Sequence, residues 1–175
     1  RLLVDVRTPK EGETIYDPAC GTGGMLLAAV SHVRERGGDP RTFFGKLHGQ
    51  EKNLTTAAVA RMNLFLHGLE PRIYLGDSIY EPDRGERYDC ILTNPPFGTK
   101  GANQAPDRED FTVATSNKQL NFIQHILTVL KPGGRAAVVL PDNCLFADQA
   151  GEVFKIVTED CRLHTGLRLQ RGTFT

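Results

Sequence analysis

Short apolar runs alternate with longer amphipathic stretches along the chain. In the longer stretches apolar residues recur three or four positions apart, as in Ala58, Met62 and Phe65, which is the spacing of one helix face. This pattern predicts helices over residues 24–36, 54–66, 120–130 and 151–158. The short runs predict strands over residues 13–16, 46–50, 72–75, 88–93, 135–140 and 163–169.

Strands that alternate with helices predict an α/β fold, a doubly wound and mostly parallel sheet of Rossmann type with helices on both faces. Residues 90–92 and 136–140 are almost continuously apolar, as expected for strands buried on both faces. The polar stretch 98–117 has no periodicity, and a loop of that length in a compact domain is usually functional or disordered. Its basic residues Lys100 and Arg108, with Lys118 nearby, are equally consistent with phosphate contacts and with a solvated loop.

The composition narrows the class of protein without giving a function. A length of 175 residues corresponds to one domain, and 21 basic against 21 acidic residues leave no electrostatic footprint for nucleic acid or an anionic membrane. No apolar run approaches the roughly 18 residues of a membrane span. Four widely spaced cysteines and five scattered histidines show no metal-ligand spacing, so we expect a reduced, cytoplasmic protein without a metal site.

A glycine-rich turn follows the first predicted strand. It reads DPACGTGG over residues 17–24 and is followed by a helix, so its backbone can approach a ligand closely and the helix start can face a negative group. The dinucleotide fingerprint G-x-G-x-x-G is not met, because Leu26 stands where the third glycine would be. Asp17, Glu51 and Asp77 each follow or end a predicted strand, which predicts three carboxylates at one edge of the sheet, with Glu51 suited to ribose hydroxyls.

The fourth predicted strand ends in the sequence TNPPFG, residues 93–98. Pro95 and Pro96 lack N–H groups, so this segment offers mainly carbonyl acceptors, and the Asn94 amide oxygen is another acceptor. The ring of Phe97 can stack on a flat ligand. The four residues therefore predict a site for a planar ligand that carries an exocyclic amino group.

Together these segments resemble the S-adenosylmethionine-dependent DNA methyltransferases that act on amino groups. Among them the chain is most similar to N6-adenine enzymes of one kind, the modification subunits of type I restriction-modification systems. The supporting stretches are ARMNLFLHG (60–68), NFIQHIL (121–127) and LKPGGRAAVVLPD (130–142). The resemblance runs from about Val4 to Phe174.

The resemblance implies a role for each motif residue. The methionine end of S-adenosylmethionine would lie against Asp17, Ala19, Gly21 and Gly23. Glu51 would hold the ribose hydroxyls, and Asp77, with Ser78 beside it, the adenine amino group of the cofactor. Asn94 and the Pro95 carbonyl would bind the target amino group, while Phe97 would stack on the target base. The base must leave the duplex first, which gives Phe97 and the 98–117 loop a role in base flipping.

The resemblance also implies partners: double-stranded DNA, a specificity subunit that reads the target sequence, and a restriction subunit. Residues 1–175 would be one catalytic core within a longer chain. Such enzymes have a further cofactor-binding segment before the first strand, to which Thr8-Pro9 is not equivalent, and a final antiparallel strand that we do not find here.

Two alternatives keep part of this interpretation. Asn-Pro-Pro-aromatic motifs also occur in enzymes that methylate a glutamine amide in proteins, although the aromatic residue there is usually tyrosine. A non-catalytic cofactor-binding scaffold within a DNA-binding complex is the other, although all the acceptor residues are present.

Overall fold

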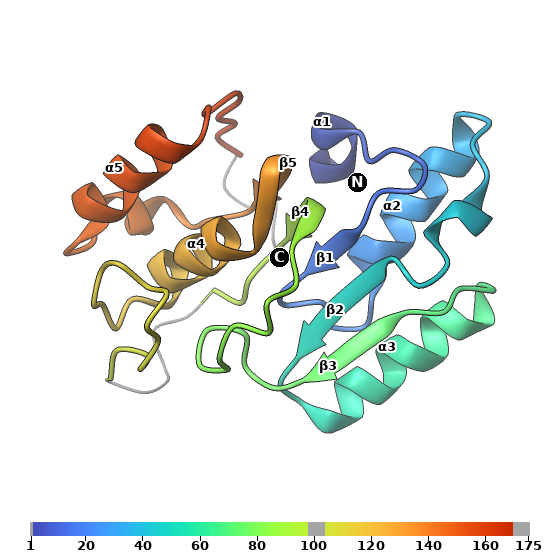
Figure 1. Cartoon of the computed structure of the whole chain (residues 1–175), viewed down its shortest axis with the longest axis horizontal. Helices are drawn as coiled ribbons and strands as arrows, with labels where there is room; N and C mark the ends of the chain where they lie inside the picture. The colour runs from blue at the N-terminus through green and yellow to red at the C-terminus, as the bar shows by residue number, and fades with distance from the viewer. Residues whose placement is uncertain (1, 98–103, 170–175) are drawn as a thin grey trace.

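The computed structural model describes residues 2–97 and 104–169. Five strands form one sheet, and helices alternate with them as predicted from the sequence, except between the third and fourth strands, which a loop joins (Figure 1). The strands are β1 (Ile15–Asp17), β2 (Leu47–Glu51), β3 (Arg72–Leu75), β4 (Tyr88–Thr93) and β5 (Leu130–Val138). The helices are α1 (Leu2–Arg7), α2 (Gly24–Glu35), α3 (Leu54–Leu66), α4 (Lys118–Val129) and α5 (Ala150–Asp160), with the 3-10 turns η1 (Pro40–Phe43) and η2 (Asp142–Phe146).

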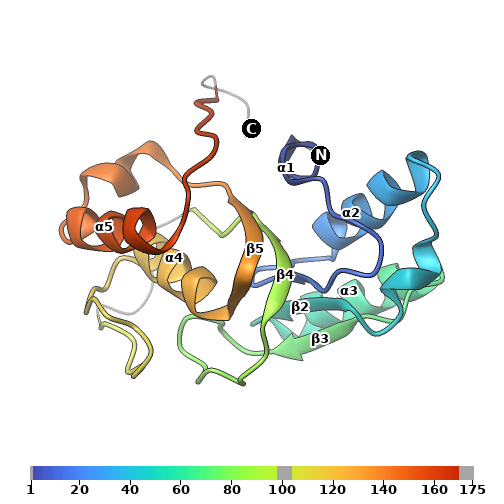
Figure 2. The ribbon, with the colours of Figure 1, turned by 45° about the horizontal axis from the view of Figure 1, so that its top comes forward.

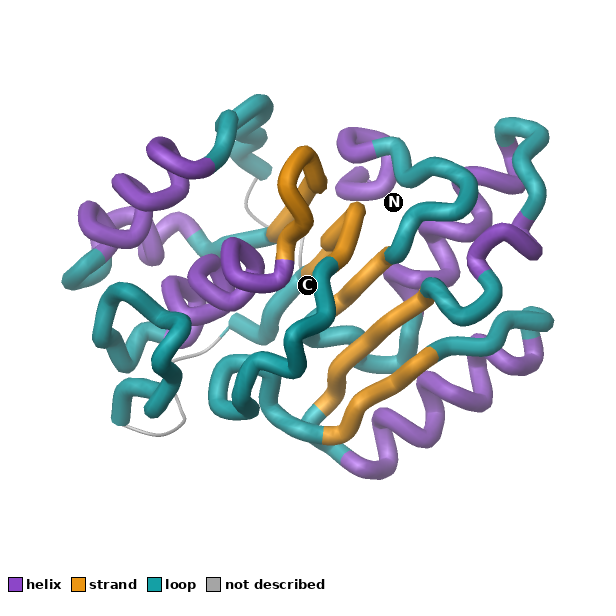
Figure 3. Tube along the Cα trace, in the orientation of Figure 1, coloured by secondary structure: helices purple, strands orange, loops and turns teal. Residues whose placement is uncertain are grey.

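The sheet is parallel throughout, in the order β3-β2-β1-β4-β5. The chain builds outward from β1 to β3 and then crosses to β4 on the other side of β1. The strand order therefore reverses between the paired strands β1 and β4. Open α/β sheets bind their ligands at the carboxyl ends of the strands at such a point. In Figure 3 the loops that follow β2 and β3 leave the sheet at the same edge.

Helices cover both faces, which confirms the predicted doubly wound fold (Figure 2). Helices α1, α2 and α3 pack on one face around a core that includes Ile15, Leu26 and Leu92. Helix α4 packs on the opposite face against Tyr16 and Ile91, and α5 packs outside α4. Apolar side chains thus cover both faces of β1 and β4, the two strands that lead to the glycine turn and to residues 94–97.

Local signals set the helix starts. The Asn53 side chain accepts a hydrogen bond from the Thr56 amide at the start of α3, and Asn117 does the same for Leu120 at the start of α4. Helix α2 begins instead after Gly23, which has a left-handed φ of 84° that favours glycine.

Two sequence predictions fail at the outer side of β5. The predicted strand over residues 163–169 is wrong, because this described segment pairs with no strand and exposes Leu163 and Leu167. Residues 136–140 are only half-buried, because within residues 2–97 and 104–169 strand β5 pairs with β4 alone. Strand β5 also begins earlier than predicted, with an irregular register against β4 between Tyr88 and Cys90.

Candidate functional site

The glycine turn after β1 is held by backbone and side-chain contacts with its neighbours. The Cys20 amide donates to the Gln50 carbonyl (3.0 Å), and the Asn63 side chain in α3 donates to the Thr22 carbonyl (2.9 Å). A Cβ atom on Gly23 would lie 3.0 Å from Leu64 Cδ1, whereas one on Gly21 would meet nothing within 4 Å. Gly23 thus packs against α3, and Gly21 faces open space.

Asp17 ends β1 as a buried carboxylate, 3% exposed. Its Oδ1 accepts a hydrogen bond from the Ala19 amide (3.0 Å). Burial raises the pKa of Asp17 to about 6, because the charged form loses hydration, while the hydrogen bonds to the carboxylate only partly oppose this rise. The neighbouring charge of Glu51 raises the pKa further. Ionisation of the buried Asp17 therefore costs free energy of desolvation. A cationic ligand bound beside the carboxylate would offset this cost.

Glu51 and Asp77 follow on the next two strands. The Gly76 amide donates to the Glu51 carbonyl (3.0 Å), which joins the ends of β2 and β3. Glu51 Oε1 accepts a hydrogen bond from the Asn53 amide (2.8 Å). Asp77 Oδ2 lies 3.9 Å from Lys52 Nζ, in a pair whose lysine is exposed and whose carboxylate is half-buried. The strand order places all three predicted carboxylates at one edge, on three adjacent strands.

Ser78 is placed differently from the other cofactor-binding candidates. It is 2% exposed, and its hydroxyl donates to the Pro18 carbonyl (2.9 Å). This hydroxyl is therefore engaged in joining the turn after β3 to the turn after β1.

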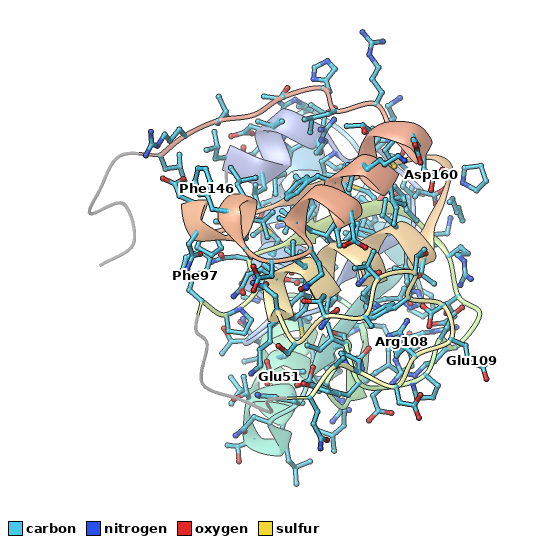
Figure 4. The ribbon with its side chains drawn as sticks, turned by 90° about the vertical axis from the view of Figure 1, so that its left-hand side faces the viewer. Glu51, Phe97, Arg108, Glu109, Phe146 and Asp160 are labelled. Carbon is cyan, nitrogen blue, oxygen red and sulfur yellow. The ribbon has the colours of Figure 1, made fainter. Side chains whose placement is uncertain are left out.

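The Asn94-Pro95-Pro96-Phe97 segment follows β4, across the switch point from Asp17. Asn94 is exposed, Pro95 is buried, and Phe97 is 45% exposed at the surface shown in Figure 4. The Gln119 side chain, in the first turn of α4, donates to the Pro96 carbonyl (3.4 Å). The structure therefore places these residues beside the carboxylate edge, with Asn94 accessible.

The position of Arg108 differs from both interpretations of it, a phosphate contact and a residue of a solvated loop. Its side chain is 1% exposed, so it is neither a surface phosphate ligand nor part of a solvated loop. It donates to the Ser78 and Glu81 carbonyls and pairs with Asp110. Lys100 and the first part of the predicted 98–117 loop lie outside the described residues.

Other reactive side chains do not form a second centre in the described part of the chain. Burial raises the pKa of the Cys20 thiol to about 12, which keeps it protonated and unreactive. Among residues 2–97 and 104–169 there is no group of three or more His, Cys, Asp or Glu side chains that could hold a metal ion. No helix in these two ranges is long and apolar enough to cross a membrane.

Sheet order, glycine turn and strand-end carboxylates together define a protein with the S-adenosylmethionine-dependent methyltransferase fold. A solved S-adenosylmethionine-dependent O-methyltransferase from Thermotoga maritima superposes with a TM-score of 0.55 at 25% identity, covering 89% of this chain and 47% of that one. The model of the N-6 DNA Methylase family matches residues 1–175, and the chain belongs to this family.

Two relatives are more similar still. The EcoEI type I restriction enzyme methylase subunit of Escherichia coli is 37% identical over 99% of this chain and 37% of its own length. The crystal structure of the EcoKI M protein, from E. coli strain K12, superposes with a TM-score of 0.77 at 34% identity. That superposition covers 89% of this chain and 35% of the EcoKI protein. The chain thus spans little more than a third of the length of these relatives.

Proposed function

We propose that the protein transfers a methyl group from S-adenosylmethionine to the N6 amino group of adenine in DNA, as the modification subunit of a type I restriction-modification system. Residues 1–175 would form one catalytic core of that subunit. The observation that carries the proposal is the placement of Asn94 next to the strand that ends in Asp17, with Glu51 and Asp77 on the strands beyond. Membership of the N-6 DNA Methylase family supports it.

The donor set fits S-adenosylmethionine. Three carboxylates on adjacent strand ends suit a ligand with a cationic end, ribose hydroxyls and an exocyclic amine. The buried Thr93 hydroxyl, at the end of β4, lies beside the Asp17 carboxylate and lowers its pKa, so it helps to keep that carboxylate ionised for a cationic ligand. Asp17, Ala19, Gly21 and Gly23 would hold the methionine end, Glu51 the ribose, and Asp77 the adenine amine. When bound, this cofactor supplies an electrophilic methyl group.

Ser78 has a supporting role in this proposal. Because its hydroxyl already donates to the Pro18 carbonyl, Ser78 would fix the position of Asp77 relative to the glycine turn rather than bind the cofactor through that hydroxyl.

Asn94 and Pro95 would hold the target amine. The lone pair of the adenine N6 is delocalised into the ring, so this nitrogen is a poor nucleophile. The Asn94 side-chain oxygen and the Pro95 carbonyl would accept its two hydrogens, which favours a pyramidal nitrogen with its lone pair directed at the methyl group. Catalysis would then come from positioning and electrostatics, without a covalent enzyme intermediate.

Phe97 would stack on the target base once it leaves the duplex. Its ring is 45% exposed next to Asn94 in the chain, as a stacking surface requires. Pro96 would keep the Asn94–Phe97 backbone rigid, and the Gln119 contact with its carbonyl anchors this backbone to α4. A specificity subunit and a restriction subunit would be the protein partners, since the EcoEI and EcoKI relatives are methylase subunits of type I restriction enzymes.

The test is labelled-methyl transfer by the full chain together with its specificity subunit. We expect label in double-stranded DNA, recovered as N6-methyladenine after digestion to nucleosides. Label in protein glutamine would favour the glutamine-amide alternative, and cofactor binding without any transfer would favour the scaffold alternative. A chain that does not bind S-adenosylmethionine in calorimetry would overturn the proposal.

A further inference from the structure

We propose that Arg108 is a positioning residue for cofactor binding, because its buried guanidinium joins residues 108–111 to residues adjoining all three strand-end carboxylates. This inference rests on the proposed function. Arg108 would contact neither cofactor nor DNA, but it would fix the positions of the backbone segments that carry the three carboxylates.

The first part of the network is direct. Arg108 Nη1 donates to the Ser78 carbonyl (2.8 Å) and to the Glu81 carbonyl (2.9 Å). Its Nε and Nη2 hold the Asp110 carboxylate through two hydrogen bonds, and its guanidinium lies 4.3 Å from the centre of the Phe111 ring. The turn after β3 is therefore fixed by the Arg108 guanidinium, whose own position is fixed by the Asp110 carboxylate.

The second part runs through His125 in α4. Arg108 Nη1 lies 3.2 Å from His125 Nδ1, and His125 Nε2 lies 3.1 Å from the Tyr16 hydroxyl. Nη1 has two hydrogens for three acceptors, so one hydrogen is shared between His125 Nδ1 and a carbonyl. Because an arginine can only donate, Nδ1 accepts and Nε2 carries the proton. Burial, together with the Arg108 charge, lowers the pKa of His125 to about 3, so the ring stays neutral.

The direction of the remaining bonds follows from this tautomer. His125 Nε2–H donates to the Tyr16 oxygen, and the Tyr16 hydroxyl then donates to Gln50 Oε1 (3.0 Å). Gln50 Oε1 also accepts from Arg84 Nη1 (2.9 Å). Arg108 is thus connected, through three consecutive hydrogen bonds, to β1 and to β2.

Each endpoint adjoins a carboxylate of the candidate site. Tyr16 precedes Asp17, Gln50 precedes Glu51, and Ser78 follows Asp77 in the chain. Successive side chains of a strand point to opposite faces, so anchoring Tyr16 and Gln50 on the α4 face sets the backbone from which Asp17 and Glu51 project. Loss of Arg108 would loosen all three positions together.

Arg135 provides a matched control at the opposite edge of the sheet. It also holds one carboxylate through two hydrogen bonds, to Glu13 (2.8 and 2.7 Å), and also donates to two backbone carbonyls, those of Arg7 and Thr8. It lies near the amino ends of the strands, so its loss removes a similar set of bonds without touching the carboxylate edge.

The experiment compares Arg108→Gln with Arg135→Gln in the full chain with its specificity subunit. We expect Arg108→Gln to raise both the Kd and the KM for S-adenosylmethionine by about tenfold or more, with kcat at saturating cofactor within about threefold of the parent. Arg135→Gln should change that KM by less than about twofold. A purely structural defect would reduce the number of active molecules, lowering apparent kcat while leaving KM unchanged.

Tyr16→Phe keeps the test decisive if Arg108→Gln does not fold. It removes the hydroxyl between His125 and Gln50 but keeps the ring stacked on Tyr88, with ring centres 4.3 Å apart. We expect a rise in cofactor KM of about threefold to tenfold. An unchanged cofactor KM in Tyr16→Phe, or in a folded Arg108→Gln, would overturn the positioning role. A parent chain that binds no cofactor would instead overturn the proposed function, and this inference with it.

Discussion

The Ser78 hydroxyl donates a 2.9 Å hydrogen bond to the Pro18 carbonyl, and this bond spans the end of an intervening strand. Ser78 follows β3, Pro18 follows β1, and β2 lies between them in the sheet. The bond therefore joins the two turns that flank Glu51, the last residue of β2. A short polar side chain, buried at 2% exposure, thus sets the spacing of the turns that carry Asp77 and Asp17.

Removal of this bond should weaken folding and cofactor binding together. Ser78→Ala leaves the Pro18 carbonyl buried without its donor, which costs about 1–3 kcal/mol in the free energy of unfolding. We expect cofactor affinity to fall by about threefold to tenfold in the same variant. Urea unfolding and calorimetry measure the two effects. Thr158→Ala is the control, because its hydroxyl also donates to a carbonyl (Lys155, 2.9 Å) but at an exposed position in α5, and it should change neither quantity appreciably.

Asp17 predicts a pH dependence of cofactor binding. Its pKa of about 6 means that the carboxylate becomes protonated as the pH falls through 6, and a neutral Asp17 no longer attracts a cationic ligand. Below pH 6 the Kd for S-adenosylmethionine should therefore rise by up to about tenfold per pH unit, whereas above about pH 7 it should be flat. Calorimetry between pH 5 and pH 8 measures this, and Asp17→Asn should bind weakly with no such dependence. A parent profile as flat as that of Asp17→Asn would contradict the prediction.

The stability of the cofactor-free protein should have the opposite trend. The folded-state pKa of Asp17 lies above the ordinary aspartate value of 3.8, so between about pH 4 and pH 6 the folded state binds the proton more tightly than the unfolded chain does. The contribution of Asp17 to stability is therefore greatest below pH 4 and is lost as the pH rises through 6. Asparagine stays neutral at every pH, so the unfolding free energy of Asp17→Asn should exceed that of the parent by a margin that grows from about pH 4 to pH 6.

Local sequence patterns were sufficient for much of the fold and for the clustering of three carboxylates at one edge of the sheet. Strand β4 and helix α3 occur over the predicted residues because a continuous apolar run and an asparagine cap are local signals. The clustering of Asp17, Glu51 and Asp77 could be predicted because the ends of neighbouring parallel strands meet at one edge.

The failures share a physical cause. Besides Asp110, Arg108 bonds to two distant backbone carbonyls and contacts His125, and no pattern in the surrounding polar residues indicates these distant partners. The alternating apolar residues of 163–169 suit a strand, but a strand also needs a neighbour to pair with, which no local pattern supplies. Long-range partners are therefore what the sequence alone could not provide.

The two left-handed glycines of the turn should respond differently to alanine. Both have positive φ, 52° at Gly21 and 84° at Gly23, so an alanine costs about 1 kcal/mol at either position from the backbone alone. At Gly23 the new Cβ would also lie 3.0 Å from Leu64 Cδ1, against nothing within 4 Å at Gly21. We expect Gly23→Ala to lower the unfolding free energy by about 2–3 kcal/mol and Gly21→Ala by about 1 kcal/mol. Denaturant unfolding without cofactor measures both, and equal losses would show that Leu64 moves aside freely.

Substitution of Asn94 should reduce methyl transfer without weakening cofactor binding. Its side chain is exposed after β4, so Asn94→Ala should leave the unfolding free energy within about 0.5 kcal/mol of the parent. Loss of one of the two acceptors for the target amine should reduce kcat by about a hundredfold or more, while the Kd for S-adenosylmethionine stays within about twofold. Labelled-methyl transfer and calorimetry measure these two effects on the same preparation.

Two further variants identify the chemical group responsible. Asn94→Leu keeps the bulk of the side chain but has no oxygen acceptor, so it should lose as much activity as Asn94→Ala, whereas a mere loss of bulk would affect alanine alone. Asn143→Ala removes another exposed asparagine, in η2, and should leave kcat unchanged. If Asn94→Ala retained the parental kcat, the target amine would need other acceptors, and the role of Asn94 in holding it would be wrong. If Asn94→Ala instead lost cofactor affinity in step with activity, the side chain would belong to the cofactor half of the site.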